Sequence, residues 1–222
     1  MAFSGKSETG QTVTYTDGKR YLYFMSVFLP MVPTLSVAAY FLSGSNVLTT
    51  LIPVFFIFGL VPLVDAILGE DLNNPPEEVV DEMANDQFYR FLVMSSVPLF
   101  WLSFFSTAYL VGTQDLPWWS ILALMIGVGT TNGGCLTTGH ELGHKHSPWD
   151  RFFAKLACAV CGYAHFCIEH NRGHHVWVST PEDPASSRMG ETIYHFASRE
   201  LPGTFRRGWE QEALRLSKRG KS

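Results

Sequence analysis

Four long apolar stretches restrict what this chain can fold into more than any other feature of its sequence. They cover residues 21–42, 47–68, 91–111 and 118–138, and only Asp65, near the end of the second, adds a charge. A helix needs about 20 apolar residues to cross a bilayer, whereas buried helices of a soluble domain show polar faces at helical spacing. The sequence therefore predicts four membrane-spanning helices in an all-α, polytopic membrane helix bundle.

The distribution of Lys and Arg predicts how these helices are oriented. The connections 43–46 and 112–117 carry almost no charge, while Lys and Arg occur in the first 20 residues and again after residue 138. Membrane proteins keep segments rich in Lys and Arg in the cytoplasm. We therefore expect a cytoplasmic arm at 1–20, four spans within 21–138 and a cytoplasmic or interfacial region at 139–222. The net charge of −4 gives no argument for nucleic acid.

Two histidine clusters follow the last apolar stretch. The first is His140-Glu141-Leu142-Gly143-His144-Lys145, and the second is Glu169-His170-Asn171-Arg172-Gly173-His174-His175. Residues four apart share one face of a helix, so each cluster presents two imidazoles side by side, and His175 lies one step further round. Five imidazoles exceed what one four-coordinate ion needs, and they suit iron, zinc, copper or nickel. The clusters therefore predict a histidine-rich metal-binding cap with a binuclear redox site.

The apolar run between the clusters, residues 156–168, has 13 residues, too few to cross a membrane. A crossing there would also place the two clusters on opposite sides of the bilayer. We expect an interfacial or buried helix that folds the second cluster back onto the first. The four cysteines, Cys135, Cys158, Cys161 and Cys167, lie in or beside apolar segments. We interpret them as buried free thiols rather than a redox pair or half a zinc site.

Two other metal chemistries compete with a binuclear histidine site. The first cluster matches the HExxH pattern of zinc proteases, in which two histidines bind zinc and the glutamate is the base. A zinc protease needs only one further ligand. His170, His174 and His175 of the second cluster are therefore more histidines than such a site would use. Glu141-x-x-His144 also matches the motif of soluble carboxylate-bridged di-iron bundles. That motif needs a second copy, and Glu169 has Arg172 at the corresponding place.

Taken together, the two clusters resemble those of the membrane di-iron hydroxylases and desaturases, whose first histidine motifs have the forms HExxHK and EHxxGHH. Further matches narrow the resemblance to the alkane 1-monooxygenases. They are Leu63-Val-Asp65-Ala, Gly69-Glu-Asp-Leu-Asn-Asn-Pro-Pro-Glu-Glu78, Gly162-Tyr-Ala-His165-Phe, Asp183-Pro-Ala-Ser-Ser-Arg-Met-Gly-Glu191 and Arg215-Leu-Ser. The family adds two more spans and two more histidine motifs, so this chain looks like the N-terminal part of such an enzyme.

The resemblance implies terminal hydroxylation of medium-chain n-alkanes to 1-alkanols in the bacterial inner membrane. Two iron ions on the cytoplasmic side would activate O₂, with electrons from NAD(P)H through rubredoxin reductase and rubredoxin. Matched residue by residue, the metal ligands are His140, His144, His170, His174 and His175, and no catalytic residue is expected beyond them. Because the family's other ligands have no counterpart here, residues 1–222 alone are expected to be inactive. The alternatives are a membrane-embedded zinc metallopeptidase and an inactive membrane or metal-binding fragment.

Several residues near these motifs have expected supporting roles. Glu141 and Glu169 adjoin the ligands and would orient or polarise imidazoles from outside the metal site, and Asp183 is a weaker candidate for the same role. His165 is expected to be a structural partner, and His146 and His195 are expected to be ordinary surface or interface residues. Aligning on Pro62-Leu-Val-Asp65 places Ile57 at a position that lines the family's substrate channel. The other interpretation is that Ile57 faces lipid or a neighbouring helix.

Overall fold

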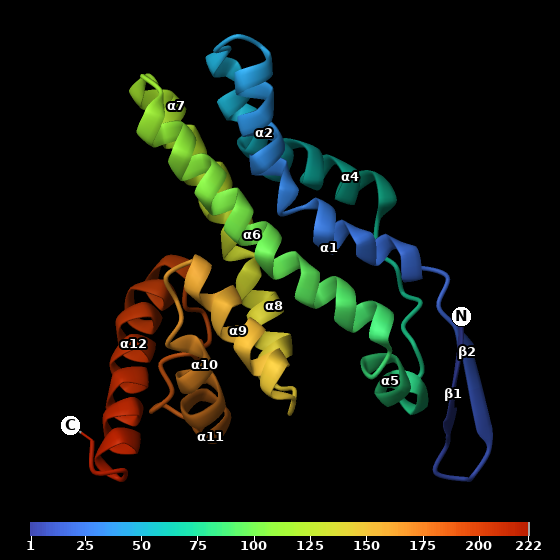
Figure 1. Cartoon of the computed structure of the whole chain (residues 1–222). Coiled ribbons are helices and arrows are strands. Elements are labelled where there is room, and N and C mark those ends of the chain that lie inside the picture. Colours follow the sequence, from blue (N-terminus) through green and yellow to red (C-terminus); the bar gives the residue numbers. More distant parts are fainter. Residues whose placement is uncertain (222) are drawn as a thin grey trace. The chain divides into compact units, whose positions relative to one another are not determined.

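The computed structural model describes residues 1–221, which fall into two compact units, residues 1–134 and 135–221. Helices form most of both units (Figure 1). The only sheet within the described part of the chain is a two-stranded hairpin near the N-terminus. The helical fold confirms the prediction of an all-α chain.

The hairpin was not predicted from the sequence. It pairs β1 (Ala2–Lys6) antiparallel with β2 (Thr12–Thr16). Helix α5 (Glu77–Ala84) packs against β1 so closely that a Cβ on Gly5 would lie 1.8 Å from the backbone oxygen of Glu78. The first residues therefore form a structured arm rather than an extended polar tail.

The first apolar stretch is broken rather than a single straight helix. It consists of η1 (Arg20–Phe24), α1 (Met25–Phe28) and α2 (Met31–Leu42). The segments before and after the break differ in direction by 50°. Pro30 lies at the break and caps α2, as expected of a residue that disrupts the helical hydrogen-bond ladder. The stretch counts as one span only if this bent pair crosses the membrane as a unit.

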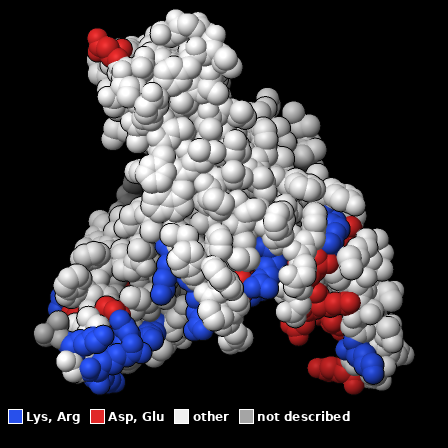
Figure 2. Space-filling view, viewed as in Figure 1, with Lys and Arg blue, Asp and Glu red and all other residues white. Residues whose placement is uncertain are grey.

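The other three apolar stretches form continuous helices long enough to cross a bilayer, Val47–Leu68, Gln87–Thr113 and Trp118–Gly143. The first of these contains η2 (Val47–Leu51), α3 (Ile52–Phe55), the π-helical turn η3 (Phe56–Leu60) and α4 (Val61–Leu68). The second is α6 (Gln87–Thr113), and the third contains α7 (Trp118–Gly133) and α8 (Cys135–Gly143). Figure 2 shows almost no charge over the end of the first unit formed by α2, α6 and α7.

The helices of the first unit pack closely at a position occupied by glycine. Helix α2 packs against α6, and α3 packs against α7. A Cβ on Gly127 of α7 would lie only 2.7 Å from the Cβ of Pro53 in α3. Since those atoms would overlap, Gly127 is required for this contact. The first unit also has a small apolar core, formed by Val37, Tyr40, Leu110, Leu116, Leu124 and Val128.

The second unit contains both histidine clusters. Helix α8 packs against α9 (Pro148–Val160). The chain then forms three short segments: α10 (Phe166–Glu169), the π-helical turn η4 (His170–His174) and α11 (His175–Trp177). The long helix α12 (Ile193–Ser217) follows and packs against α10 (Figure 1).

The prediction of one helix over residues 156–168 is wrong. Helix α9 ends at Val160, and Gly162 adopts a left-handed conformation with φ of +73°. Gly162 N–H donates to the Ala159 carbonyl at 3.0 Å, and Tyr163 N–H donates to the Cys158 carbonyl at 2.9 Å. These two bonds form a Schellman motif, which terminates a helix where glycine accepts a positive φ. The chain reverses there, and this reversal brings the second cluster back to the first.

Candidate metal centre

The first cluster lies on α8 and presents two imidazoles on one face. His140 and His144 are one helical turn apart, and their Nε2 atoms are 3.2 Å apart. Their ring centroids are separated by 4.7 Å. This is the arrangement that the spacing of four residues predicts.

The second cluster differs from the predicted α-helical arrangement because η4 is a π-helical turn. Its hydrogen bonds span five residues instead of four, which places His175 over His170. The Nε2 atoms of these two residues are 3.1 Å apart. The rings of His170 and His174 are also stacked, with centroids 5.3 Å apart. The wider turn therefore brings three imidazoles to one side of a short segment.

The two clusters meet within the second unit. The rings of His140 and His170 have centroids 4.4 Å apart, and those of His144 and His175 are 4.9 Å apart. One nitrogen from each of His140, His144 and His170 lies within 4.8 Å of the others. The predicted meeting of the clusters is therefore present, with His170 buried between them and 7% exposed.

The spacing of these nitrogens fits a metal ion. A metal–imidazole bond is about 2.0–2.1 Å long, so two nitrogens bound at right angles lie about 3 Å apart. The distances of 3.2 Å and 3.1 Å match that value. Burial and the neighbouring imidazoles lower the pKa of His170 to about 4, and burial also lowers the pKa of His144. Neutral imidazoles leave a lone pair free for a metal ion.

Asp183 supports the second cluster from behind. This buried carboxylate lies 2.8 Å from His174 Nδ1 through its Oδ2 atom, which also accepts a hydrogen bond from Ser186 Oγ at 2.6 Å. Burial alone would raise the pKa of Asp183, but hydrogen bonds from Ser186, His174 and Arg207 hold it below its usual value. Asp183 is therefore ionised and accepts from His174 Nδ1, which leaves Nε2 as the ring atom available to a metal ion.

Arg207, on α12, joins two acids next to the histidine clusters, and no sequence pattern predicted it. Its Nε donates to Glu169 at 2.9 Å, and its terminal nitrogen donates to Asp183 at 2.5 Å. Burial raises the pKa of Glu169, and the charge of Arg207 offsets only part of that rise. A Cβ on Gly173 would lie 2.6 Å from the Glu169 carboxylate and 2.9 Å from Arg207 Nε. Gly173 therefore leaves room for this ion pair.

The remaining predicted residues have different surroundings. Glu141 is exposed and pairs with Lys145 Nζ at 2.9 Å. His165 packs between Tyr163 and Phe205, in agreement with a structural role. Ile57 is half-buried in η3 of the first unit. The two lone histidines, His146 and His195, are exposed.

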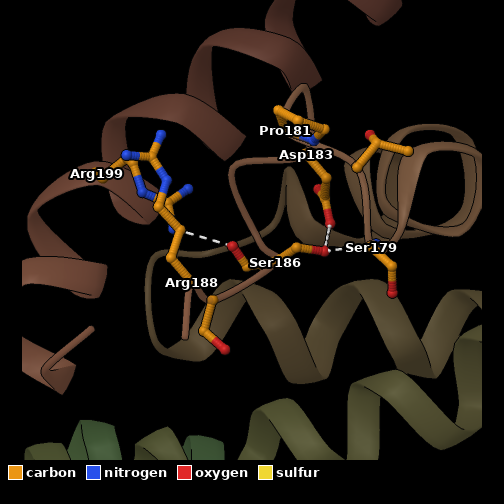
Figure 3. Close-up of a pocket in the computed structure, with 8 residues that line it drawn as sticks. Ser179, Pro181, Asp183, Ser186, Arg188 and Arg199 are labelled. Carbon is orange, nitrogen blue, oxygen red and sulfur yellow. Dashed lines mark hydrogen bonds between the residues drawn. The ribbon is translucent and has the colours of Figure 1, made fainter. Parts of the chain in front are cut away.

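A pocket of about 330 Å³ lies beside Asp183 (Figure 3). Ser186 is one of its lining residues, and its Oγ accepts from Ser179 N–H at 2.9 Å and donates to Asp183. Arg199 closes one side and pairs with Glu191 at 2.8 Å, which lowers the pKa of Glu191 to about 2. Arg199 also donates to the backbone oxygens of Pro184 and Ser186. These bonds fix the loop that carries Asp183.

Comparisons with known proteins identify relatives over most of the chain. Residues 116–221 match the family described as Fatty acid desaturase. The chain is 47% identical over 208 residues to an alkane 1-monooxygenase of Pseudomonas putida, which covers 94% of this chain and 52% of the relative. Identity is also 47% to alkane 1-monooxygenase 1 of Alcanivorax borkumensis, over 94% of this chain and 51% of the relative. The chain thus spans about half the length of the curated relatives it matches.

A more distant relative shares part of the same region. The hydroxylase component of a xylene/toluene monooxygenase from Pseudomonas putida is 32% identical over 101 residues, which is 46% of this chain and 26% of that protein.

Proposed function

Because this chain belongs to the family of the alkane 1-monooxygenases, we propose that it contributes to terminal hydroxylation of medium-chain n-alkanes to 1-alkanols. The observation that carries the proposal is the meeting of His140, His144 and His170, with one ring nitrogen of each within 4.8 Å of the others. The family relation favours an oxygenase over a zinc peptidase. The outward pairing of Glu141 with Lys145 also gives no support to a catalytic base at that position.

We propose two iron ions as the metals. The residues that would hold them from this chain are His140, His144, His170, His174 and His175. Bound iron would supply the activation of O₂ that oxidation of an unactivated C–H bond requires. The chain's own contribution is to hold these imidazoles close together, with Asp183 holding His174 through Nδ1. Glu169, next to His170 in the chain, would hold the second cluster through its bond to Arg207. Glu141 would polarise the first cluster by its charge alone, because its carboxylate pairs with Lys145.

An n-alkane has no polar group for the protein to hydrogen-bond, so apolar contact must position it. Such a substrate dissolves in the bilayer, where the apolar helices of the first unit provide that contact. Each methylene transferred from water to an apolar site contributes about 0.8 kcal/mol. We propose that Ile57 limits how far the alkane extends. Ile57→Trp in the complete enzyme should shift the chain-length profile toward shorter alkanes, and an unchanged profile would remove Ile57 from the channel.

The redox partners would be soluble proteins. We propose rubredoxin, reduced by rubredoxin reductase, as the electron donor. The metal centre would then lie on the cytoplasmic side of a bacterial inner membrane, where such proteins can reach it. The Lys and Arg residues after residue 138 support that orientation.

Metal analysis of the complete enzyme tests the function. We expect iron in the purified protein and conversion of octane to 1-octanol with NADH, rubredoxin reductase and rubredoxin. His170→Ala should abolish octanol formation and lower bound iron, whereas His146→Ala, at an exposed histidine outside the cluster, should change neither. Stoichiometric zinc without iron, with peptidase activity lost in Glu141→Gln, would overturn the proposal.

A further inference from the structure

Two thiols of the second unit lie in contact beside the metal centre. Cys158 Sγ on α9 and Cys167 Sγ on α10 are 3.6 Å apart. Cys158 is fully buried, whereas Cys167 is half-buried. The two side chains therefore differ in access although their sulfurs touch.

Cys167 opens onto a basic pocket of about 550 Å³. Five cationic side chains line this pocket together with Cys167, namely Lys145, Arg151, Lys155, Arg172 and Arg215. The acidic Glu212 also lines it and pairs with Arg215. Figure 2 shows Lys and Arg gathered around the C-terminal end of α12, which carries Arg215. Excess positive charge beside a thiol favours its anionic form.

The two sulfurs differ in pKa because their surroundings differ. The hydrogen bond with Cys158 and the charge of Lys155 lower the pKa of Cys167. The same contact with Cys167, together with burial, raises the pKa of Cys158. A thiolate is the reactive nucleophile, and redox-sensitive cysteines are accessible, anionic and next to a second cysteine. Cys167 meets these conditions, and Cys158 is the neighbouring thiol.

We propose that Cys167 reacts with hydrogen peroxide and that Cys158 resolves the product into a Cys158–Cys167 disulfide. The Cys167 sulfur attacks one peroxide oxygen, the O–O bond breaks, and Cys167 becomes a sulfenic acid while the other oxygen leaves as water. The Cys158 sulfur then attacks the Cys167 sulfur, the S–O bond breaks, and the hydroxide takes the Cys158 proton and leaves as a second water. Two thiols are oxidised and one peroxide is reduced.

The disulfide would disturb both histidine clusters, and this consequence rests on the function proposed above. A disulfide bond is about 2.05 Å long, so the sulfurs must approach by about 1.5 Å from their present 3.6 Å. A Cβ on Gly139, the residue before His140, would lie 2.5 Å from Cys158 Sγ. Cys167 precedes His170 by three residues. Movement of either sulfur is therefore transmitted to a metal ligand.

Peptide mapping tests the reaction in the full chain. The chain is treated with hydrogen peroxide in the presence of a chelator, and free thiols are then blocked and the protein digested with chymotrypsin. Cleavage after Tyr163 and Phe166 separates Cys167 from Cys158, so a disulfide joins two peptides. We expect that linked pair, and we expect Cys167→Ser to slow the first thiol oxidation about tenfold or more. In Cys158→Ser, dimedone should trap a sulfenic acid on Cys167.

Cys161→Ser is the matched control. Cys161 is also half-buried at the end of α9, and its sulfur donates to the Cys158 carbonyl at 3.3 Å. The variant should keep both the rate and the linkage, and it excludes Cys161 as the residue joined to Cys167. Oxidation first at Cys135 or Cys161, or a sulfenic acid that never forms on Cys167, would overturn the proposal.

Cobalt(II) absorption tests the effect on the metal ligands. The disulfide should weaken cobalt binding roughly tenfold, in the range caused by loss of an outer contact to a ligand. Dithiothreitol should restore binding in the wild type, and Cys158→Ser should show no peroxide-dependent loss. An unchanged cobalt affinity in the protein with the Cys158–Cys167 disulfide would contradict the predicted effect on the metal ligands. Neither measurement involves an alkane, so failure of octane hydroxylation would be seen separately.

Discussion

The two oxygens of the Asp183 carboxylate accept hydrogen bonds from different partners. Oδ2 holds His174 and Ser186, while Oδ1 accepts from Arg207 and from the Ala185 N–H at 3.1 Å. Hydrogen bonds of this kind fix the tautomer and the orientation of a ligand imidazole. The orientation of His174 therefore depends on a residue that would not itself touch the metal.

Asp183→Asn should weaken metal binding about 10- to 100-fold, the range for loss of such outer partners. The amide has the same shape but is a weaker acceptor, and its NH₂ group can face the imidazole. Cobalt(II) titration followed by visible absorption measures the change. Glu182→Gln, at the exposed neighbouring acid, should bind cobalt as the wild type does. Equal affinities for both variants would show that Asp183 does not position His174.

Arg207→Met should destabilise the second unit by about 3–5 kcal/mol, because it leaves two buried carboxylates without their cation. Arg206→Met is the control, since Arg206 is exposed and its pair with Glu210 is a surface ion pair. Surface pairs contribute about 0–1 kcal/mol. Denaturant unfolding in detergent micelles compares the two. A loss for Arg207→Met no larger than that for Arg206→Met would contradict the buried network.

Among the elements, the contact between α3 and α7 shows how glycine positions two apolar helices. Small residues let helix backbones approach closely in membranes, where hydrophobic burial adds little between helices. The glycines of α7 do not all serve this purpose. Gly127 faces Pro53 and Val54, whereas a Cβ on Gly129 would meet no atom within 4 Å.

Gly127→Ala should therefore destabilise the first unit by about 1–3 kcal/mol, the usual cost of overpacking. Gly129→Ala adds the same methyl group two residues later, into open space, and alanine favours a helix more than glycine does. That variant should be neutral or slightly stabilising. Unfolding in mixed micelles by increasing dodecyl sulfate gives the comparison. Equal stability of the two variants would show that the close contact between Gly127 and Pro53 does not stabilise the first unit.

The sequence predicted those elements whose residues carry a local signal. Residues 47–68 were predicted as a helix with the same bounds as in the structure, because their apolar character begins and ends sharply. The grouping of His140 and His144 follows from helical spacing. The break at Gly162 and the π-helical turn at His170 depend on backbone conformations that no periodicity reports. Arg207 contacts residues 24 and 38 positions away, so only the folded chain identifies it.

For the molecule as a whole, the apolar helices are left largely uncovered by the chain itself. Within the most apolar windows of the three continuous spans, only 11%, 28% and 39% of the residues are buried. A soluble protein does not expose apolar surface on that scale. The exposure fits helices that contact lipid or further protein within the membrane.

Reporter fusions test the orientation of these helices. Fusions after Leu42, Leu68, Val111 and Lys145 should alternate outside, inside, outside and inside, if the Lys and Arg distribution sets the topology. A fusion after His175 should also report inside. The fusion after Leu42 is the decisive one because the first stretch is bent by 50°. A cytoplasmic signal there would mean that the bent pair enters and leaves on the same side.

The described chain contains two π-helical turns, and each coincides with a residue assigned to the proposed activity. Ile57 lies in η3, and His170 and His174 lie in η4. A π-helical turn is equivalent to one residue inserted into an α-helix. In an α-helix of the same residues His175, five positions after His170, would point about 140° away from it. The π-helical turn reduces that rotation, so the extra residue brings both His174 and His175 to His170 at the expense of backbone order.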